Sequence, residues 1–283
     1  MPDKLTIPDL MEKMANGEPI SMITCYDYPT ARIIDRAGVD LVLVGDSVAM
    51  TVLGHKTTLP ATMDMMLIFA EAVARGCERA FVIGDMPYMS YQVSVSEAIR
   101  NAGRYMAEAA VDCVKLEGGR AMCDAVRGIV HAGIPVMGHL GLTPQSASAI
   151  GGYKVQGRSG QAAINILEDA LALQDAGAYS VLLELVPARI TEVITEKLEI
   201  PTISIGAGAG ASGFCQIFHD AVGMFEAFTP RHAKQYASIG AQIREAMDQF
   251  VADIKDRTYP GPEHSFKVAS DALNEFLEYA EKR

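Results

Sequence analysis

Short apolar runs rich in Val, Ile and Leu recur along most of the chain, and segments with helical periodicity separate them. Runs that are apolar at consecutive positions are typical of parallel strands that are buried on both faces. The runs are ISMITCY (20–26), LVLVGD (41–46), AFVIGD (80–85), CVKLEG (113–118), IPVMGHL (134–140), SVLLELV (180–186), PTISIGA (201–207) and CQIFHD (215–220). The pattern therefore predicts repeated strand and helix units around one parallel sheet.

The glycine-rich segment GAGAGASG (206–213) joins the last two runs and is too short to contain a full crossover helix. It bears a superficial likeness to a dinucleotide-binding fingerprint, but its spacing differs and no helix clearly follows it. A tight backbone turn is the better interpretation. Eight strands in this order predict an α/β fold of the (β/α)₈ TIM barrel type, with an open doubly wound sheet as the alternative.

Residues after about Phe225 show helical periodicity up to the end of the chain. We expect a single (β/α)₈ barrel domain over residues 1–283, with residues 226–283 as a helical C-terminal extension of it. The last helix carries an apolar stripe, which packs either on its own barrel or on a neighbouring subunit. The stripe consists of Leu273, Phe276, Leu277 and Ala280.

Composition narrows the classes of function. The formal net charge of −11 opposes nucleic-acid binding, which needs clustered Lys and Arg. No apolar stretch approaches the ~20 residues of a membrane span. The five cysteines are scattered and never form Cys-x-x-Cys, which favours free thiols in a reducing cytoplasm over a zinc site or disulfides. We expect a cytoplasmic protein that acts on small molecules.

Ionisable residues stand at the ends of five successive predicted strands. Because the carboxyl ends of barrel strands meet at the catalytic rim, we expect these side chains to converge there. An isolated acid at such a position is more often a helix cap, but five adjacent strands repeating the feature are harder to explain in that way. The residues are Asp46, Asp85, Lys115, Glu117, His139 and Glu184.

Several carboxylates close together repel one another unless a cation neutralises them, so the pattern predicts a metal. Oxygen ligands without a cysteine or histidine cluster favour a hard ion, Mg²⁺ before Ca²⁺ or Mn²⁺. Its open positions would take the carboxylate and keto oxygens of a 2-oxo acid. The keto group would then stabilise negative charge after loss of the neighbouring proton.

Two residues of this set have alternative interpretations. Glu184 has apolar neighbours in LLELVP, which suits a general base, whereas a salt bridge on the outer face is the structural alternative. Lys115 stands two residues before Glu117, so it faces the same side and would either hold a substrate carboxylate or pair with Glu117. The loop GGYKVQGR (151–158) is interpreted as a lid, an anion contact or a surface loop.

Eight longer motifs, spread over roughly residues 20–266, carry a resemblance to a known family. They are TCYDYPTA, VGDSVAMTVLGH, DMPYMSY, VKLEGG, GHLGLTPQ, GGYKVQGR, LELVP and YPGPEHSF. In these motifs and their order the chain resembles the 3-methyl-2-oxobutanoate (ketopantoate) hydroxymethyltransferases of pantothenate biosynthesis. The resemblance implies the fold of the phosphoenolpyruvate mutase and isocitrate lyase superfamily and a homo-oligomer, commonly a decamer.

The resemblance also implies which residues bind metal and substrate. Asp46 and Asp85 would bind Mg²⁺, with Glu117 completing the carboxylate set. Ser47 and Lys115 would contact the 2-oxo acid beside Asp46 and Asp85.

The catalytic roles implied by the resemblance fall on two residues. Glu184 would be the proton acceptor and His139 a neighbour of the reacting groups. The reaction implied is transfer of a hydroxymethyl group from 5,10-methylenetetrahydrofolate to C3 of 3-methyl-2-oxobutanoate, giving 2-dehydropantoate and tetrahydrofolate.

Three places depart from the pattern usual in this family. Lys56 replaces an acidic residue, Phe69 replaces a histidine, and the Ser-Gly-Phe of residues 212–214 replaces Asp-Gly-Gln. We expect these places to affect the outer pocket, and thus the choice of 2-oxo acid or of the one-carbon donor, or else the assembly. The alternatives are a paralogue for another 2-oxo acid, a folate-independent carbon–carbon lyase or mutase of the superfamily, and a non-catalytic metabolite-binding barrel.

Overall fold

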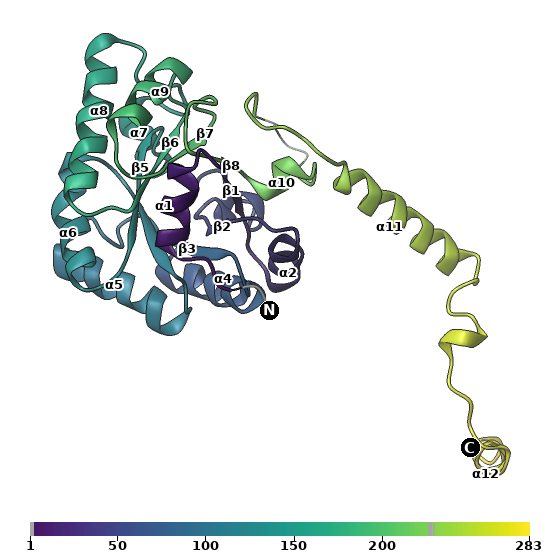
Figure 1. Cartoon of the computed structure of the whole chain (residues 1–283). Coiled ribbons are helices and arrows are strands. Elements are labelled where there is room, and N and C mark those ends of the chain that lie inside the picture. The colour runs from purple at the N-terminus through teal and green to yellow at the C-terminus, as the bar shows by residue number, and fades with distance from the viewer. Residues whose placement is uncertain (1–2, 226–227, 229) are drawn as a thin grey trace. The chain divides into compact units, whose positions relative to one another are not determined.

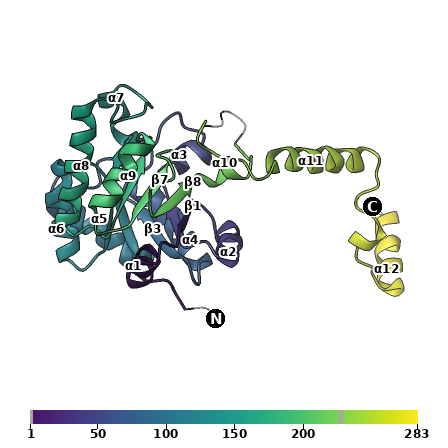
Figure 2. The same cartoon turned by 45° about the horizontal axis from the view of Figure 1, so that its top comes forward.

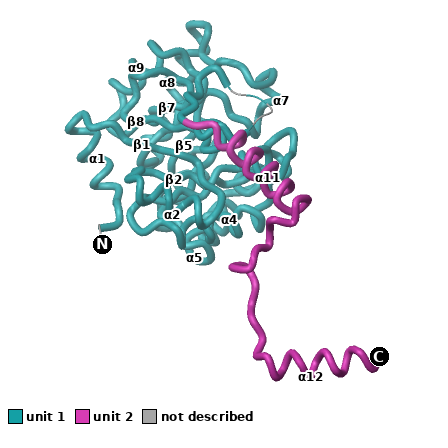
Figure 3. The backbone as a smooth tube through the Cα atoms, turned by 90° about the vertical axis from the view of Figure 1, so that its right-hand side faces the viewer, with its two compact units in different colours: residues 1–236 teal, residues 237–283 magenta. Residues whose placement is uncertain are grey.

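A computed structural model describes residues 3–225, 228 and 230–283 (Figure 1). The chain forms two compact units, Met1–Tyr236 and Ala237–Arg283, drawn in different colours in Figure 3. The boundary predicted at residue 226 lies outside the described residues. No helix in the described part of the chain is long and apolar enough to cross a membrane.

The first unit is a closed barrel of eight parallel strands in sequential order, so the predicted (β/α)₈ fold is confirmed and the open sheet is ruled out. Strand β1 pairs with both β2 and β8, which closes the barrel. The strands are β1 (Ile20–Thr24), β2 (Leu41–Val44), β3 (Phe81–Asp85), β4 (Cys113–Glu117), β5 (Val136–Gly141), β6 (Ser180–Glu184), β7 (Thr202–Ile205) and β8 (Gly213–Gln216).

Helices surround this barrel on the outside and cover its ends (Figure 1). The outer helices and short helical turns of the first unit are α1 (Ile7–Ala15), α2 (Tyr28–Arg36), α3 (Val48–Thr51), α4 (Met63–Gly76), α5 (Val95–Glu108), η1 (Arg120–Met122), α6 (Cys123–His131), η2 (Pro144–Ser146), α7 (Ala147–Ile150), α8 (Gly160–Asp175), α9 (Ala188–Lys197) and α10 (Phe218–Ala221). The second unit contains α11 (Ile239–Lys255), η3 (Pro262–His264) and α12 (Ser270–Glu281).

Strands β2 to β6 each contribute to two hydrophobic cores because successive side chains point to opposite faces. In β2, Val42 and Val44 belong to the core between the barrel and its helices, whereas Leu41 and Leu43 belong to the core inside the barrel. Both faces are therefore buried, which explains why the strands read as uninterrupted apolar runs.

Helix α1 closes the amino-terminal end of the barrel. Thr6 and Asp9 form a capping box at its start, and its one buried residue, Leu10, joins the core inside the barrel. Figure 2 shows α1 at the bottom of the barrel and α7 at the top. The opposite, carboxyl-terminal end is thus left for the site.

The eighth strand differs from its prediction. It begins at Gly213, inside the glycine-rich segment, and residues 218–220 of the predicted run lie in α10. A side chain at Gly213 would come within 2.5 Å of the backbone oxygen of Ile20, so only glycine fits where the short connection enters the sheet. The apolar pattern alone marks neither this start nor the change to a helix.

Candidate active site

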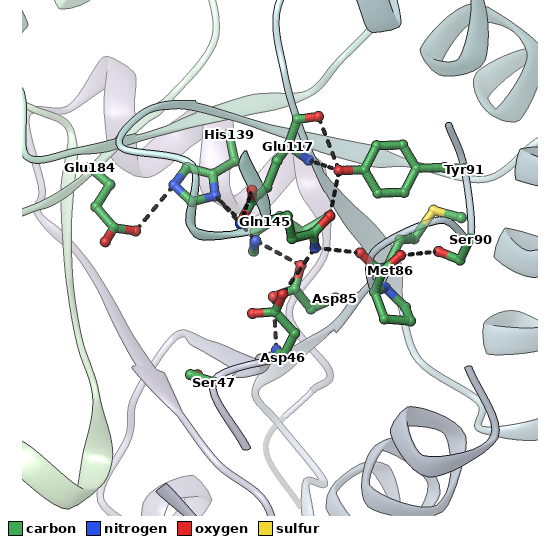
Figure 4. Close-up of polar contacts among 12 residues, drawn as sticks. Asp46, Ser47, Asp85, Met86, Ser90, Tyr91, Glu117, His139, Gln145 and Glu184 are labelled. Atoms are coloured by element: carbon green, nitrogen blue, oxygen red, sulfur yellow. Dashed lines mark hydrogen bonds and ion pairs between the residues drawn. The ribbon is translucent and has the colours of Figure 1, made fainter. Parts of the chain in front are cut away.

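A cavity of about 540 Å³ opens at the carboxyl-terminal ends of the strands. All seven site residues predicted from the sequence line it: Asp46, Ser47, Asp85, Lys115, Glu117, His139 and Glu184. We call the six ionisable residues of this set, that is all except Ser47, the acid–base cluster (Figure 4). Its members come from β2 through β6, and all except Glu184 are almost fully buried.

Alternation along the strands aims these side chains into the barrel. In β4, Lys115 and Glu117 follow Cys113 at intervals of two, and Cys113 belongs to the interior core. The strand register then sets the neighbours, because Asp85 lies beside Lys115 and Glu117 lies beside His139.

Lys115 pairs with Asp85 across β3 and β4. Its Nζ lies 2.7 Å from Asp85 Oδ1 and 3.3 Å from His139 Nδ1. The expected alternative of a pair with Glu117 is therefore wrong, because the register brings the partner from the neighbouring strand. Burial alone would lower the pKa of Lys115, but the charges of Asp85, Glu117 and Asp46 outweigh it and raise that pKa, so the amine stays charged.

His139 lies between two glutamates. Its Nδ1 is 3.5 Å from Glu117 Oε1, and its Nε2 is 3.2 Å from Glu184 Oε2. Burial and Lys115 would lower the pKa of His139, but Glu117 and Glu184 raise it to about 9. The imidazole is therefore protonated at neutral pH and connects the buried acids to Glu184. With a side chain 17 % exposed, Glu184 is the member of the cluster most open to the cavity.

The backbone around Glu184 is tightly constrained. Gly141, its register neighbour on β5, has φ +91°, and a side chain there would come within 2.2 Å of the Glu184 carbonyl oxygen. Leu185, the next residue, adopts φ 46°, which a leucine rarely does. Strained backbone of this kind persists where the surrounding structure enforces a functional geometry.

The opposite side of the cluster carries excess negative charge. Burial raises the pKa of Asp46 to about 8, and the charges of Asp85 and Glu117 add to the shift. Burial also raises the pKa of Asp85, although Lys115 opposes this. Four carboxylates face two cations in the cluster, so the fully ionised cluster has a formal excess of two negative charges.

This donor set fits a hard divalent cation. Asp85 Oδ1 is buried and receives no well-aligned hydrogen bond, although it forms the ion pair with Lys115. No group of three or more His, Cys, Asp or Glu side chains among the described residues is arranged to hold a metal alone. Mg²⁺ is usually held by one or two carboxylates and completes its shell with water and substrate oxygens, so Asp46 and Asp85 suit it.

Two polar residues of the site were not predicted from the sequence. Gln145 in η2 hydrogen-bonds both Asp46 and Glu117, and Thr58 presents to the cavity a buried hydroxyl that has no partner among the described residues. Gln145 is the last residue of the motif GHLGLTPQ, which is the signal that could have found it. For Thr58 the sequence offers no such signal.

The places that depart from the family pattern do not line this cavity. Lys56, Phe69 and the segment 212–214 are absent from its lining. Phe214 pairs with Ser21 near the start of β1, at the amino-terminal end of the barrel. Their expected effect on the outer pocket stays a prediction. Of the loop 151–158, only Tyr153 lines the cavity.

The closed parallel barrel and the buried acids at its carboxyl-terminal end define an α/β-barrel enzyme. Solved structures share this fold. A phosphonopyruvate hydrolase, in complex with oxalate and Mg²⁺, matches with a TM-score of 0.60 and 11% identity over 99% of both chains. A 2,3-dimethylmalate lyase of the PEP mutase/isocitrate lyase superfamily matches with a TM-score of 0.56 and 15% identity over 99% of this chain and 97% of its own.

Sequence comparison identifies the family. The family described as ketopantoate hydroxymethyltransferase matches residues 4–262. A 3-methyl-2-oxobutanoate hydroxymethyltransferase of Chloroflexus aurantiacus is 49% identical over 265 residues, 94% of both chains. The protein of that name in Enterococcus faecalis is 46% identical over 270 residues, 95% of this chain and 98% of its own. The chain belongs to the ketopantoate hydroxymethyltransferase family and is thus a transferase.

Proposed function

We propose that the chain transfers a hydroxymethyl group from 5,10-methylenetetrahydrofolate to C3 of 3-methyl-2-oxobutanoate, giving 2-dehydropantoate for pantothenate biosynthesis, with Mg²⁺ bound. One observation carries the proposal. A glutamate that reaches the cavity, Glu184, lies beside a cluster of buried carboxylates whose charge is not compensated. Family membership supplies the identity of the substrates.

The buried acids would hold the metal and the substrate. Asp46 and Asp85 would bind Mg²⁺, with Glu117 completing the carboxylate set, and the bound ion would supply positive charge opposite the keto oxygen of the substrate. The structural relative that holds oxalate together with Mg²⁺ supports this, because oxalate carries two adjacent oxygen donors like a 2-oxo acid. Lys115 and Ser47 would face the substrate carboxylate.

Glu184 would perform the proton transfer. Its carboxylate accepts the proton from C3, and the electron pair left on that carbon forms the new bond to the methylene carbon of the folate. The two carbon–nitrogen bonds of that methylene carbon break, so tetrahydrofolate leaves, and water supplies the hydroxyl oxygen of the product. Protonated His139, 3.2 Å from Glu184, holds the base in place while the proton moves. Apolar side chains in the lining, among them Leu142 and Leu182, suit the branched carbon chain of the substrate.

Assembly and location form part of the same proposal. Five free cysteines, all buried, suit a reducing cytoplasm. The homo-oligomer, and the decamer in particular, rests on the resemblance to the family.

The proposal is tested by proton NMR of 3-methyl-2-oxobutanoate in D₂O with enzyme and Mg²⁺. We expect the C3 proton to exchange without folate, and product to form when tetrahydrofolate and formaldehyde are added. Glu184→Gln should slow exchange by at least about 10³-fold, since a positioned base contributes about 10²–10⁴-fold, while Mg²⁺ affinity stays nearly unchanged. Glu192→Gln, at an exposed glutamate that pairs with Arg189 on α9, is the matched control.

Each alternative has its own outcome in this assay. Carbon–carbon cleavage of the substrate without folate would favour a lyase. Exchange of another 2-oxo acid in preference to this one would favour a paralogue. A complete absence of exchange under every condition would contradict the proposal and favour a non-catalytic barrel.

A further inference from the structure

Gln145 occupies the centre of the polar contacts at the carboxyl-terminal end of the barrel (Figure 4). Its side-chain Nε2 donates to Asp46 Oδ2 at 2.9 Å and to the carbonyl oxygen of Met86 at 3.0 Å. Its backbone N–H donates to Glu117 Oε2 at 3.0 Å. One residue from the loop after β5 therefore contacts the ends of β2, β3 and β4.

The orientation of the amide is fixed from both sides. A carboxylate and a carbonyl only accept hydrogen bonds, so the nitrogen must face Asp46 and Met86. The oxygen faces two donors, the Tyr91 hydroxyl at 2.8 Å and Gln92 Nε2 at 3.2 Å. With a residue exposure of 6 %, every polar atom of this side chain is buried and used. Such a network is rigid because any rotation leaves buried groups unpaired.

The chemistry of an amide suits a site for a cation. Negative charges on Asp46, Asp85 and Glu117 repel one another and would turn the side chains apart. Gln145 holds two of these carboxylates by hydrogen bonds, yet it adds no charge. A lysine or arginine in its place would neutralise the acids and reduce their attraction for a metal.

We propose that Gln145 is a positioning residue that holds Asp46 and Glu117 in the arrangement that binds the divalent cation. The inference rests on the proposed function of this site. If it is right, removal of the amide donors lowers the affinity for Mg²⁺ more than it slows the proton transfer at Glu184, because Gln145 contacts the acids and not the base.

Calorimetric titration of the purified protein with Mg²⁺ alone tests the inference. Gln145→Met keeps the length of the side chain but removes its side-chain donors to Asp46 and Met86, while the backbone N–H that contacts Glu117 stays in place. We expect Mg²⁺ affinity to fall by about 10- to 100-fold, the range for residues that orient metal ligands. Gln92→Met is the control, because Gln92 contacts the amide oxygen of Gln145 and the backbone N–H of Tyr91 but neither carboxylate, and we expect a change of less than about 3-fold.

C3 exchange at increasing Mg²⁺ separates positioning from collapse of the structure. In Gln145→Met, saturating Mg²⁺ should restore the exchange rate to within about 3-fold of the wild type, which a misfolded site would not allow. Wild-type Mg²⁺ affinity in Gln145→Met would overturn the inference, as would an exchange rate that Mg²⁺ does not restore. If the wild type binds Mg²⁺ but exchanges no proton, the proposed function fails, and the affinity comparison still decides the role of Gln145.

Discussion

Strand β2 has a buried aspartate at each end, and the two have opposite electrostatic surroundings. Asp40 precedes the strand, Asp46 follows it, and each is 4 % exposed. Asp40 accepts hydrogen bonds from the backbone and hydroxyl of Ser21 and forms ion pairs with Arg79 and Lys13. Burial would raise the pKa of Asp40, but these partners outweigh it and hold that pKa below its usual value.

Asp46 lacks such compensation. Its carboxylate accepts a hydrogen bond from neutral Gln145, and its charged neighbours include Asp85 and Glu117, so its pKa rises to about 8. The amino-terminal end of the barrel thus uses its aspartate to stabilise the fold. The carboxyl-terminal end keeps its aspartate at an energetic cost, which is expected where charge is reserved for a ligand or a reaction.

The largest effects are expected from two separate variants, in each of which one of the aspartates is changed to asparagine. Asp46→Asn removes a proposed metal ligand and should lower Mg²⁺ affinity by at least about 100-fold, with little loss of stability. Asp40→Asn leaves Arg79 and Lys13 without their charge partner and should lower the unfolding free energy by about 2 kcal/mol or more. The loss is smaller than for a fully buried ion pair because both cations are partly exposed. Calorimetry and urea denaturation measure the two quantities.

One variant should change stability but not activity, and the other activity but not stability. Asp40→Asn, once folded, should exchange C3 at the wild-type rate, because Asp40 lies at the other end of the barrel. A loss of stability in Asp46→Asn as large as that in Asp40→Asn would contradict the contrast.

The pH dependence of stability should show the same contrast with a smaller effect. In the metal-free protein the pKa of Asp46 is about 8 against an ordinary 3.8, and that of His139 is about 9 against 6.5. The native state therefore binds more protons than the unfolded state between these values. Asp46 should lower stability as pH rises from about 4 to 8, and His139 as pH rises from about 6.5 to 9, each with a slope of up to about 1.4 kcal/mol per pH unit.

Asp40 should act in the opposite direction. Its pKa is lowered in the folded state, so its contribution is present above the ordinary value and is lost as pH falls below it. Urea midpoints at about pH 5, 7 and 9, with EDTA or with Mg²⁺, measure these effects. Saturating Mg²⁺ should reduce the loss at high pH because it favours ionised Asp46. Identical pH profiles with and without Mg²⁺ would show that the ion does not bind these acids.

The sequence predicted those features that strand periodicity controls. Strands β2 to β7 appear as apolar runs because both of their faces are buried, and the spacing of Lys115 and Glu117 places both inside the barrel. It placed Asp46 at the catalytic rim but did not predict the partners of either aspartate, because Arg79 and Gln145 reach them from distant parts of the chain. Such contacts follow from strand register and loop conformation, which no local pattern records.

The smallest expected effect concerns two buried hydroxyls that have no partner among the described residues, one inside the lining of the cavity and one outside it. Thr58 lines the cavity, whereas Thr191 lies in α9 outside its lining. A buried unsatisfied hydroxyl costs about 1–3 kcal/mol, so Thr58→Val and Thr191→Val should each raise the unfolding free energy, by about 1 kcal/mol. If the Thr58 hydroxyl is kept for a ligand, only Thr58→Val should also raise KM for the 2-oxo acid or the folate, by roughly 5- to 10-fold. Thr58→Ser should restore KM, and an unchanged KM in Thr58→Val would show that this hydroxyl does not contact either substrate.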